Sequence, residues 1–291
     1  MIRRKPSLIS IATEAAISFL MLMPDGSSRT LASLPLEAFL DEDAGTADLP
    51  EAVMQSVNQM LVVPDYWMGN SFQEFQARKK SVITAFIERK LKLEQPSLTE
   101  VDDFYNYALV NGQGHAPHLY TFYLQEVVAY QVYQRLKDLG ISPICITTPA
   151  LVWQARLDGN AGSFSEQGVG FIHLVEADCF LYCFFMGKFL FSRHIQLPDT
   201  PGDASETYNL LNYEINQSFY LYSQKTKRSV DTLYMLAADP AAAGQLTDLL
   251  GREVIGIPET SPPTDALEEK VLLPSCRGFN AGDLKASGGH C

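Results

Sequence analysis

The sequence predicts an α/β protein with two sheets, each covered by helices, and two observations support this fold class. Residues 8–26 and 171–187 have the same strand-turn-strand pattern, and each copy continues through a Gly-bearing turn to a third strand. Helical segments follow the three strands in both halves of the chain. Repeats of a supersecondary unit define architectures, and 46% apolar residues in a chain of 291 can fill two lobes of ordinary domain size.

The first half opens with the duplicated strand pair, expected at 8–23, and a third strand at 30–36. A helix from Pro50 to about Leu61 is expected, because proline is well tolerated in the first turn of a helix. The apolar spacing from Gln73 to Lys92 predicts an amphipathic helix. The remaining expected elements are a hairpin with a long connection at 102–110 and 118–124, a helix at 126–139, a short strand at 144–146 and a helix at 148–157.

The second half repeats the opening unit and continues with alternating helices and strands. Its expected elements are three strands within 168–197, a long helix at about 206–226, a strand at 230–236, a helix at 241–250 and a strand at 254–257. A Gly- and Ser-rich loop at 158–165 is the best candidate boundary between lobes. We therefore expect a first lobe at 1–165 with an inserted helical and hairpin subdomain, a second lobe at 166–273, and a flexible tail at 274–291.

Charge and composition exclude several classes of protein. The net charge is −12 and the 22 basic residues form no long run, so nucleic acid is not an expected partner. No apolar run reaches the roughly 18 residues of a spanning helix, and no secretory signal follows the basic start, so the chain is expected to be soluble. Five cysteines without C-x-x-C spacing fit a reducing cytoplasm, with Cys145, Cys179 and Cys183 as buried thiols.

The helix expected at 73–92 carries the densest positive patch of the chain. A solvated helix face is the simplest interpretation, and contact with an acidic partner or with lipid headgroups is the alternative. The basic residues of this face are Arg78, Lys79, Lys80, Arg89, Lys90 and Lys92.

Three segments of the second half, at 187–195, 212–222 and 230–236, resemble a known family. They contain a Gly turn, a strand ending Ser-Arg-x-Ile, a helix bearing Glu-Ile-x-x-Ser-x-x-Tyr and a strand that starts Val-Asp. This pattern is similar to PilM-like proteins of type IV pilus assembly, which are related to the cytoplasmic part of GspL of type II secretion. The resemblance implies an actin-like (ribonuclease H-like) duplicated fold of two lobes. Its second lobe would be reduced, because only residues 196–206 stand where ATP-binding members insert a subdomain.

The duplicated turns depart from the nucleotide-binding pattern. Nucleotide-binding actin-like proteins place Asp-x-Gly in each turn, where Gly lets the backbone approach phosphate and Asp organises the metal. The resemblance aligns Ser10 and Ala12 with these positions in the first copy, and His173 and Val175 in the second. A Cβ at each former Gly blocks the approach, and residues 237–243 replace the family's Gly-rich adenosine loop. We therefore expect no cofactor and no metal.

An active actin-like ATPase is the alternative, with ATP and Mg held by the shifted carboxylates Glu14, Glu176 and Asp178. No G-x-S-x-G, Walker A, H-E-x-x-H or G-x-G-x-x-G motif is present, and no catalytic residue is predicted.

Histidines and one glutamate are the other polar candidates. His173 is the one imidazole at a phosphate-turn position, and we interpret it as a core residue. His115 and His118 lie three apart in a predicted loop, without the accompanying ligands of a zinc site. Glu214 falls where actin-like relatives contact the nucleoside; without the Gly-rich loop, its expected role is on the helix surface or in a polar contact with Arg193.

Aromatic residues are concentrated in the expected hairpin of the first half. One face of such a strand pair packs inward, and the other face is exposed or covered by a partner. The resemblance implies a first-lobe groove for the short cytoplasmic peptide of a membrane partner, and aromatics are favoured in such grooves. The partner-binding candidates are Tyr105, Tyr107, Tyr120 and Phe122.

The expected function is that of a non-catalytic scaffold, associated with the cytoplasmic face of the inner membrane. It would bind a membrane-anchored pilus or secretion assembly protein through a short peptide and link it to a motor ATPase. A variant of this hypothesis is a truncated GspL whose spanning helix lay beyond Cys291.

Overall fold

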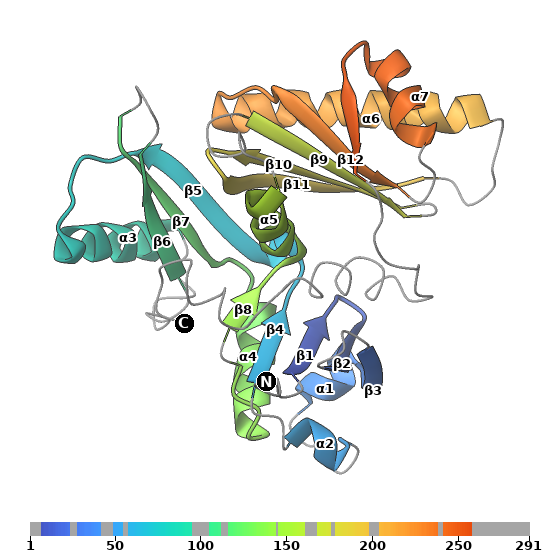
Figure 1. Ribbon diagram of the computed structural model, residues 1–291. Coiled ribbons are helices and arrows are strands. Elements are labelled where there is room, and N and C mark those ends of the chain that lie inside the picture. Colours follow the sequence, from blue (N-terminus) through green and yellow to red (C-terminus); the bar gives the residue numbers. More distant parts are fainter. Residues whose placement is uncertain are drawn as a thin grey trace, which may run out of the picture.

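The computed structural model describes most of the chain as two five-stranded sheets, one three-stranded sheet and their helices (Figure 1). We call these the first sheet, the second sheet and the small sheet. The described residues are 7–23, 28–41, 49–54, 58–94, 105–111, 116–143, 145–160, 168–175, 178–197, 204–237 and 241–257. No helix in these stretches combines the length and apolar composition that crossing a membrane requires. The predicted lobe boundaries after residues 165 and 273 and the predicted tail lie outside the described residues, and the first three residues of the loop expected at 158–165 are instead the end of a helix.

The first sheet has the strand order β3-β2-β1-β4-β8. Its first three strands form an antiparallel meander, and β4 and β8 continue parallel to β1 on the other side. The strands are β1 (Ser7–Ala12), β2 (Ala16–Leu22), β3 (Ser28–Pro35), β4 (Asn58–Val62) and β8 (Cys145–Thr147). The helices beside it in the chain are α1 (Leu36–Leu40), α2 (Glu51–Met54) and α4 (Val127–Asp138).

The second sheet repeats this topology with the order β11-β10-β9-β12-β13. Again an antiparallel meander precedes two parallel strands, each reached through a helix. Its elements are β9 (Gly168–Val175), β10 (Asp178–Phe185), β11 (Lys188–Gln196), α6 (Ala204–Thr226), β12 (Thr232–Ala237), α7 (Ala241–Leu250) and β13 (Val254–Ile257). The repeated strand order confirms the predicted duplicated α/β fold.

Two expectations for the first half were wrong. The helix expected from Pro50 to about Leu61 is only α2, because residues 58–62 form β4 between β1 and β8. The helix expected from Gln73 starts later, as α3 (Lys80–Glu94), because the chain before it forms β5 (Met68–Glu74). In both places, pairing with strands distant in the sequence overrides the local helical signal.

The small sheet consists of β5, β7 and β6 in that order and is inserted between β4 and α4 in the chain. Its strands β6 (Tyr105–Val110) and β7 (His118–Leu124) pair antiparallel, which confirms the expected hairpin. Helix α3 packs on one face through Ile83 and Ile87, which contact Leu119. Figure 1 shows this sheet and α3 projecting to one side of the molecule.

The other face of the small sheet packs against the hairpin turn between β10 and β11. This two-residue turn uses Met186 and Gly187, whose φ values are 50° and 67°, as tight hairpins with right-handed twist require. It directs Phe185 onto Phe72, with ring centroids 5.8 Å apart, and holds Lys188 above the ring of Tyr120. The small sheet is therefore fixed to the second sheet by aromatic packing.

Helix α5 (Pro149–Asn160) connects the two halves and lies between the first and second sheets (Figure 1). Trp153 packs on Phe171 of β9, with ring centroids 4.5 Å apart, and only 2% of its surface is exposed. At the next residue of the helix, the side chain of Gln154 accepts a hydrogen bond from the backbone N–H of Phe189 at 2.8 Å. Helix α5 thus contacts two strands of the second sheet, β9 through ring packing and β11 through a hydrogen bond.

Candidate functional site

The turn between β1 and β2 is closed by its own hydrogen bonds. Thr13 Oγ1 accepts a bond from the Ala16 N–H at 3.0 Å, and the Thr13 N–H donates to the Ala16 carbonyl at 2.8 Å. A phosphate site at such a turn requires backbone N–H groups that point outward to the ligand. Two of the N–H groups at this turn are therefore already used inside the protein.

The residues aligned with Asp-x-Gly in the first copy do not lie in the turn itself. Ser10 and Ala12 belong to β1, where they pair with Phe19 and Ile17 of β2, and both are buried. This corrects the sequence-based placement in the turn, which consists of residues 13–15. The Cβ of Ala12 is part of the packed core of the sheet.

In the second copy, His173 lies in the middle of three aromatic rings. Its ring centroid is 5.2 Å from Trp153, 6.3 Å from Phe180 and 6.5 Å from Phe171, and the residue is buried. This confirms its interpretation as a core residue. Val175 ends β9, paired with Asp178, and the turn at 176–177 lies outside the described residues.

The ATPase alternative assigns a metal ion to three carboxylates, and two of these have other partners in the structure. Burial raises the pKa of Tyr66, and Glu14, which interacts with the hydroxyl of this tyrosine, raises that pKa further. Asp178 Oδ1 accepts a hydrogen bond from His194 Nε2 at 2.6 Å, on the neighbouring strand. Glu176 lies outside the described residues. Within the described part of the chain, no three His, Cys, Asp or Glu side chains are grouped to hold a metal ion.

His118, a second metal candidate, uses both ring nitrogens for hydrogen bonds. Its Nδ1 is 2.7 Å from the carbonyl oxygen of Ala116, and Arg228 Nη2 donates to its Nε2 at 3.3 Å. This arrangement assigns the proton of the neutral ring to Nδ1. The His118 ring is also stacked on Phe72, so it joins the small sheet to the segment after α6. His115 lies outside the described residues.

Sequence reasoning missed Asp65, which lies at the junction of β4, β8 and α5. It begins the short 3₁₀ helix η2 (Asp65–Trp67) directly after β4, and its Oδ1 accepts a hydrogen bond from the Ala150 N–H in the first turn of α5 at 3.0 Å. The residue keeps some surface exposure, but its carboxyl group is densely surrounded, and this burial raises its pKa to about 6. An acidic residue after an apolar strand was the available signal, but that strand was interpreted as a helix.

Asp65 makes the stability of the protein depend on pH. Its native pKa is above the unfolded value of 3.8, so the native state binds more protons and its stability falls as pH rises towards and through 6. Asp65→Asn keeps an acceptor for Ala150 and removes this dependence. Urea unfolding should show that, between about pH 5.5 and 8, the wild type loses about 1 kcal/mol more than the variant. Equal losses in the two proteins would contradict this assignment.

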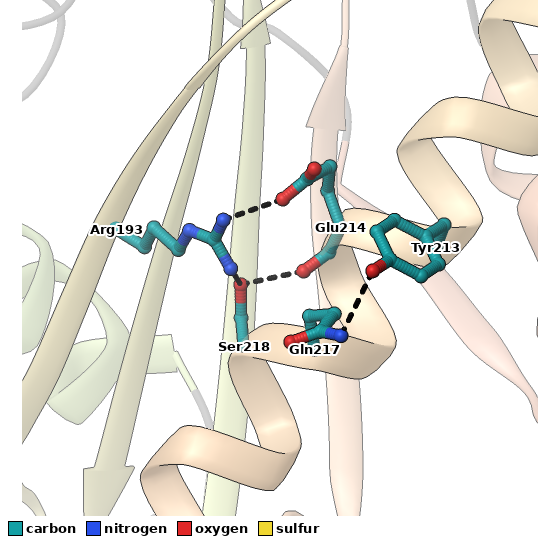
Figure 2. A network of polar contacts seen from close by, with 5 residues as sticks. All are labelled: Arg193, Tyr213, Glu214, Gln217 and Ser218. Carbon is teal, nitrogen blue, oxygen red and sulfur yellow. Dashed lines mark hydrogen bonds and ion pairs between the residues drawn. The ribbon is translucent and has the colours of Figure 1, made fainter.

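A polar network joins β11 to α6 (Figure 2). Arg193 Nη2 donates to Glu214 Oε2 at 2.5 Å and its Nη1 donates to Ser218 Oγ at 3.2 Å, and the Ser218 hydroxyl in turn donates to the Glu214 carbonyl. The predicted contact between Glu214 and Arg193 is confirmed. On the outer side of the same helix, Gln217 donates to the hydroxyl of Tyr213 at 3.0 Å. The Glu214 carboxylate thus fixes α6 to the sheet.

The four partner-binding candidates lie on two different faces of the small sheet. In the β6–β7 register, Tyr105 and Tyr107 oppose Tyr123 and Thr121, whereas Tyr120 and Phe122 oppose Ala108 and Asn106. Because side chains alternate along a strand, the two pairs point in opposite directions. Tyr120 and Phe122 are buried in the main core, whereas Tyr105 and Tyr107 are half-buried beside α3. The four residues therefore do not form one groove.

Two of the predicted buried thiols are confirmed. Cys179 and Cys183 are buried in β10, and burial raises the pKa of Cys179 to about 12 and that of Cys183 further. Both are therefore unreactive thiols in the native state. Cys145 lies in β8, and its side chain is outside the described part.

Comparisons with known proteins find likeness at the level of structure. No protein-family profile matches the sequence, and no curated protein does. A PilM-PilN type IV pilus biogenesis complex is 13% identical with a TM-score of 0.54, over 94% of this chain and 96% of that chain.

Two further solved structures match with a TM-score of 0.46 and 9% identity. One is a Bacteroides thetaiotaomicron protein with an actin-like ATPase fold and unknown function, covered over 93% of this chain and 96% of that one. The other is the cytoplasmic domain of EpsL, an inner membrane component of the Vibrio cholerae type II secretion system, covered over 95% and 96%. The repeated sheets and the likeness to the PilM-PilN structure show that this chain has a duplicated, two-lobed actin-like fold. Its second lobe is reduced, since only residues 197–203 stand between β11 and α6.

Proposed function

We propose that the protein is a non-catalytic scaffold in the assembly platform of a type IV pilus or a type II secretion system. It binds the cytoplasmic segment of a membrane partner at the inner face of the inner membrane and links it to a motor ATPase. The observation that carries this proposal is the packing of Trp153, Phe171 and His173, where β9 approaches the duplicated turn. A nucleotide-binding relative would need room for phosphate near this position.

The closed β1–β2 turn supports the same proposal. Phosphate binding at a turn depends on free N–H groups and on a backbone without a Cβ at the point of approach. Here the Ala16 N–H is bonded to Thr13, and Ala12 occupies the end of β1. The likeness to the PilM-PilN complex supports a role in pilus assembly, since that structure contains a partner protein.

Titration with Mg-ATP tests the absence of nucleotide chemistry. We expect no one-site isotherm by calorimetry at millimolar nucleotide and no ATP turnover, because the β1–β2 turn uses its N–H groups internally and His173 is packed among aromatic rings. A clear isotherm with turnover that is lost on combined alanine substitution of Glu14, Glu176 and Asp178 would overturn the scaffold and establish the ATPase alternative. Adenosine, which lacks the triphosphate of ATP, is the matched control for binding that does not depend on the phosphates.

The partner peptide is expected at the outer edge of β6. Among the described strands β6 pairs only with β7, so its other edge can add an extended peptide as a further strand. Tyr105 and Tyr107 stand at this edge, half-buried, with the Tyr105 hydroxyl donating to Glu88 at 3.4 Å. Aromatic side chains at a strand edge supply contact area at low entropic cost.

Tyr107→Ala should weaken peptide binding about tenfold, because an interface aromatic commonly contributes more than about 1.4 kcal/mol. Fluorescence anisotropy with labelled peptides from the cytoplasmic segments of single-pass membrane proteins encoded by neighbouring genes measures this. Tyr213→Ala, at an exposed tyrosine on α6, is the control and should leave the Kd unchanged. Equal Kd values for both variants would place the peptide elsewhere.

A further inference from the structure

The outer side of α3 exposes a stripe of apolar side chains. Val82, Phe86 and Leu93 are 47%, 36% and 75% exposed, whereas the inner side of the helix is buried against the small sheet. At 100° per residue, positions 82, 86, 89 and 93 fall on one side of a helix. Phe75 packs against the Phe86 ring at 4.9 Å and holds it in place. The aromatic residue of the stripe is therefore held in place at the surface.

Basic side chains surround this stripe. Between Arg78 and Glu94 the chain has six basic and two acidic residues, although its net charge is −12. The exposed cations are Arg78, Lys79, Lys80, Arg89 and Lys92. Lys90 is directed inward, 3.5 Å from Gln73 Oε1 and 3.9 Å from Glu94. Arg89 lies within the stripe and the other exposed cations lie beside it or before its first residue, so all of them face solvent.

We propose that α3 is a membrane-surface helix that rests on an anionic lipid bilayer. A helix that combines exposed apolar side chains with Lys and Arg lies in the headgroup region, where the apolar groups leave water and the cations contact lipid phosphates. Leu93, Phe86 and Val82 supply the apolar part, and Lys79 and Arg89 supply charge beside them. This surface is separate from the duplicated turns, and the inference does not depend on the proposed scaffold function.

The shape and charge of the molecule favour lipid over an acidic peptide. Figure 1 shows α3 on the outer side of the small sheet, away from α5 and from the second sheet. The three exposed apolar residues lie along one side of this single helix. A peptide ligand would be expected in a groove between elements, whereas a single exposed helix suits a flat bilayer. Anionic lipid attracts the cations of α3 and repels the acidic remainder of the chain, and this attraction and repulsion together orient α3 towards the membrane. Because salt screens charges beyond about 10 Å, acidic residues far from the bilayer do not prevent binding.

Vesicle co-sedimentation of the full chain tests the proposal. We expect binding to vesicles of equal parts phosphatidylglycerol and phosphatidylcholine, little binding to phosphatidylcholine alone, and loss of binding at high salt. Lys79→Gln with Arg89→Gln should lower the partition coefficient more than about tenfold, since each surface cation contributes roughly fivefold. Lys225→Gln with Lys227→Gln, which removes two exposed cations at the end of α6, is the matched control and should change it little.

A tryptophan reporter distinguishes contact by α3 from general adsorption. The native Trp67 and Trp153 are buried, so their emission should respond little to vesicles. Emission of Leu93→Trp should shift to the blue when anionic vesicles are added, whereas Leu221→Trp, at an exposed leucine on α6, should not shift. No binding to anionic vesicles, an equal shift for both reporters, or binding of poly-glutamate in place of vesicles would overturn the proposal.

Discussion

Replacing Trp153 with alanine is expected to lower the free energy of unfolding by about 3–5 kcal/mol, as for other buried tryptophans. Trp153 fills the space between α5 and β9, in contact with Phe171 and His173. Its removal leaves a cavity that α5 and β9 cannot close by a simple shift of the helix, because Gln154, the next residue of α5, is hydrogen-bonded to the backbone N–H of Phe189. Chemical denaturation followed by far-UV circular dichroism measures the loss.

An exposed aromatic residue provides the control for this substitution. Tyr213→Ala on α6 removes a ring that is 58% exposed and should change the unfolding free energy by no more than about 0.5 kcal/mol. If Trp153→Ala lost as little as this control, the packing of α5 against β9 would not determine stability, and the observation behind the scaffold proposal would lose its support.

Phe122→Ala should also destabilise the protein by about 3–5 kcal/mol. Phe122 lies on the buried face of β7 beside Tyr120, within the main core. The sequence-based hypothesis made Phe122 a contact for a partner peptide, and measurements of stability and of peptide affinity distinguish a core residue from such a contact. A core residue lowers the denaturation midpoint without any partner present, whereas a surface contact changes only peptide affinity.

Tyr66→Ala serves as the matched variant for Phe122→Ala, because Tyr66 is about half exposed and lies outside the small sheet. Both variants are measured by urea unfolding in the absence of peptide. Unchanged stability of Phe122→Ala would restore Phe122 as a partner-binding candidate and contradict its placement in the core.

The meander of the second sheet was predictable from sequence because its strands pair with their neighbours in the chain, and β12 was predicted from its own apolar residues although its partner β9 is distant. Each strand of the meander β9, β10 and β11 pairs with the strand next to it in the chain, and Gly187 marks one of the turns. In the first half, β4 and β5 were missed because their partners are distant. Proline at position 50 and the amphipathic residues after Gln73 are genuine helical signals, but each was extended over a strand that only tertiary pairing reveals.

Among the polar residues too, some contacts were predicted from sequence and others were missed. The contact between Glu214 and Arg193 was one of two roles that the family resemblance suggested for Glu214. Asp65, in contrast, depends on the unexpected strand β4 and on α5, which begins far along the chain. The two faces of the β6–β7 hairpin could have been separated from sequence, since alternation places Tyr105 with Tyr107 and Tyr120 with Phe122. Which face is buried depends on Phe185 and the second sheet.

The insertion of the small sheet between β4 and β8 has a consequence for synthesis on the ribosome. In the second sheet, Leu233 of β12 pairs with Val254 of β13, which follows soon after it in the chain. In the first sheet, Met60 of β4 pairs with Cys145 of β8, which is synthesised much later. Closing the longer loop carries a larger entropic penalty and slows folding. During translation the nascent chain therefore exposes β4 as an open edge until β8 emerges, and this interval is when the chain is most open to chaperone binding and misassembly.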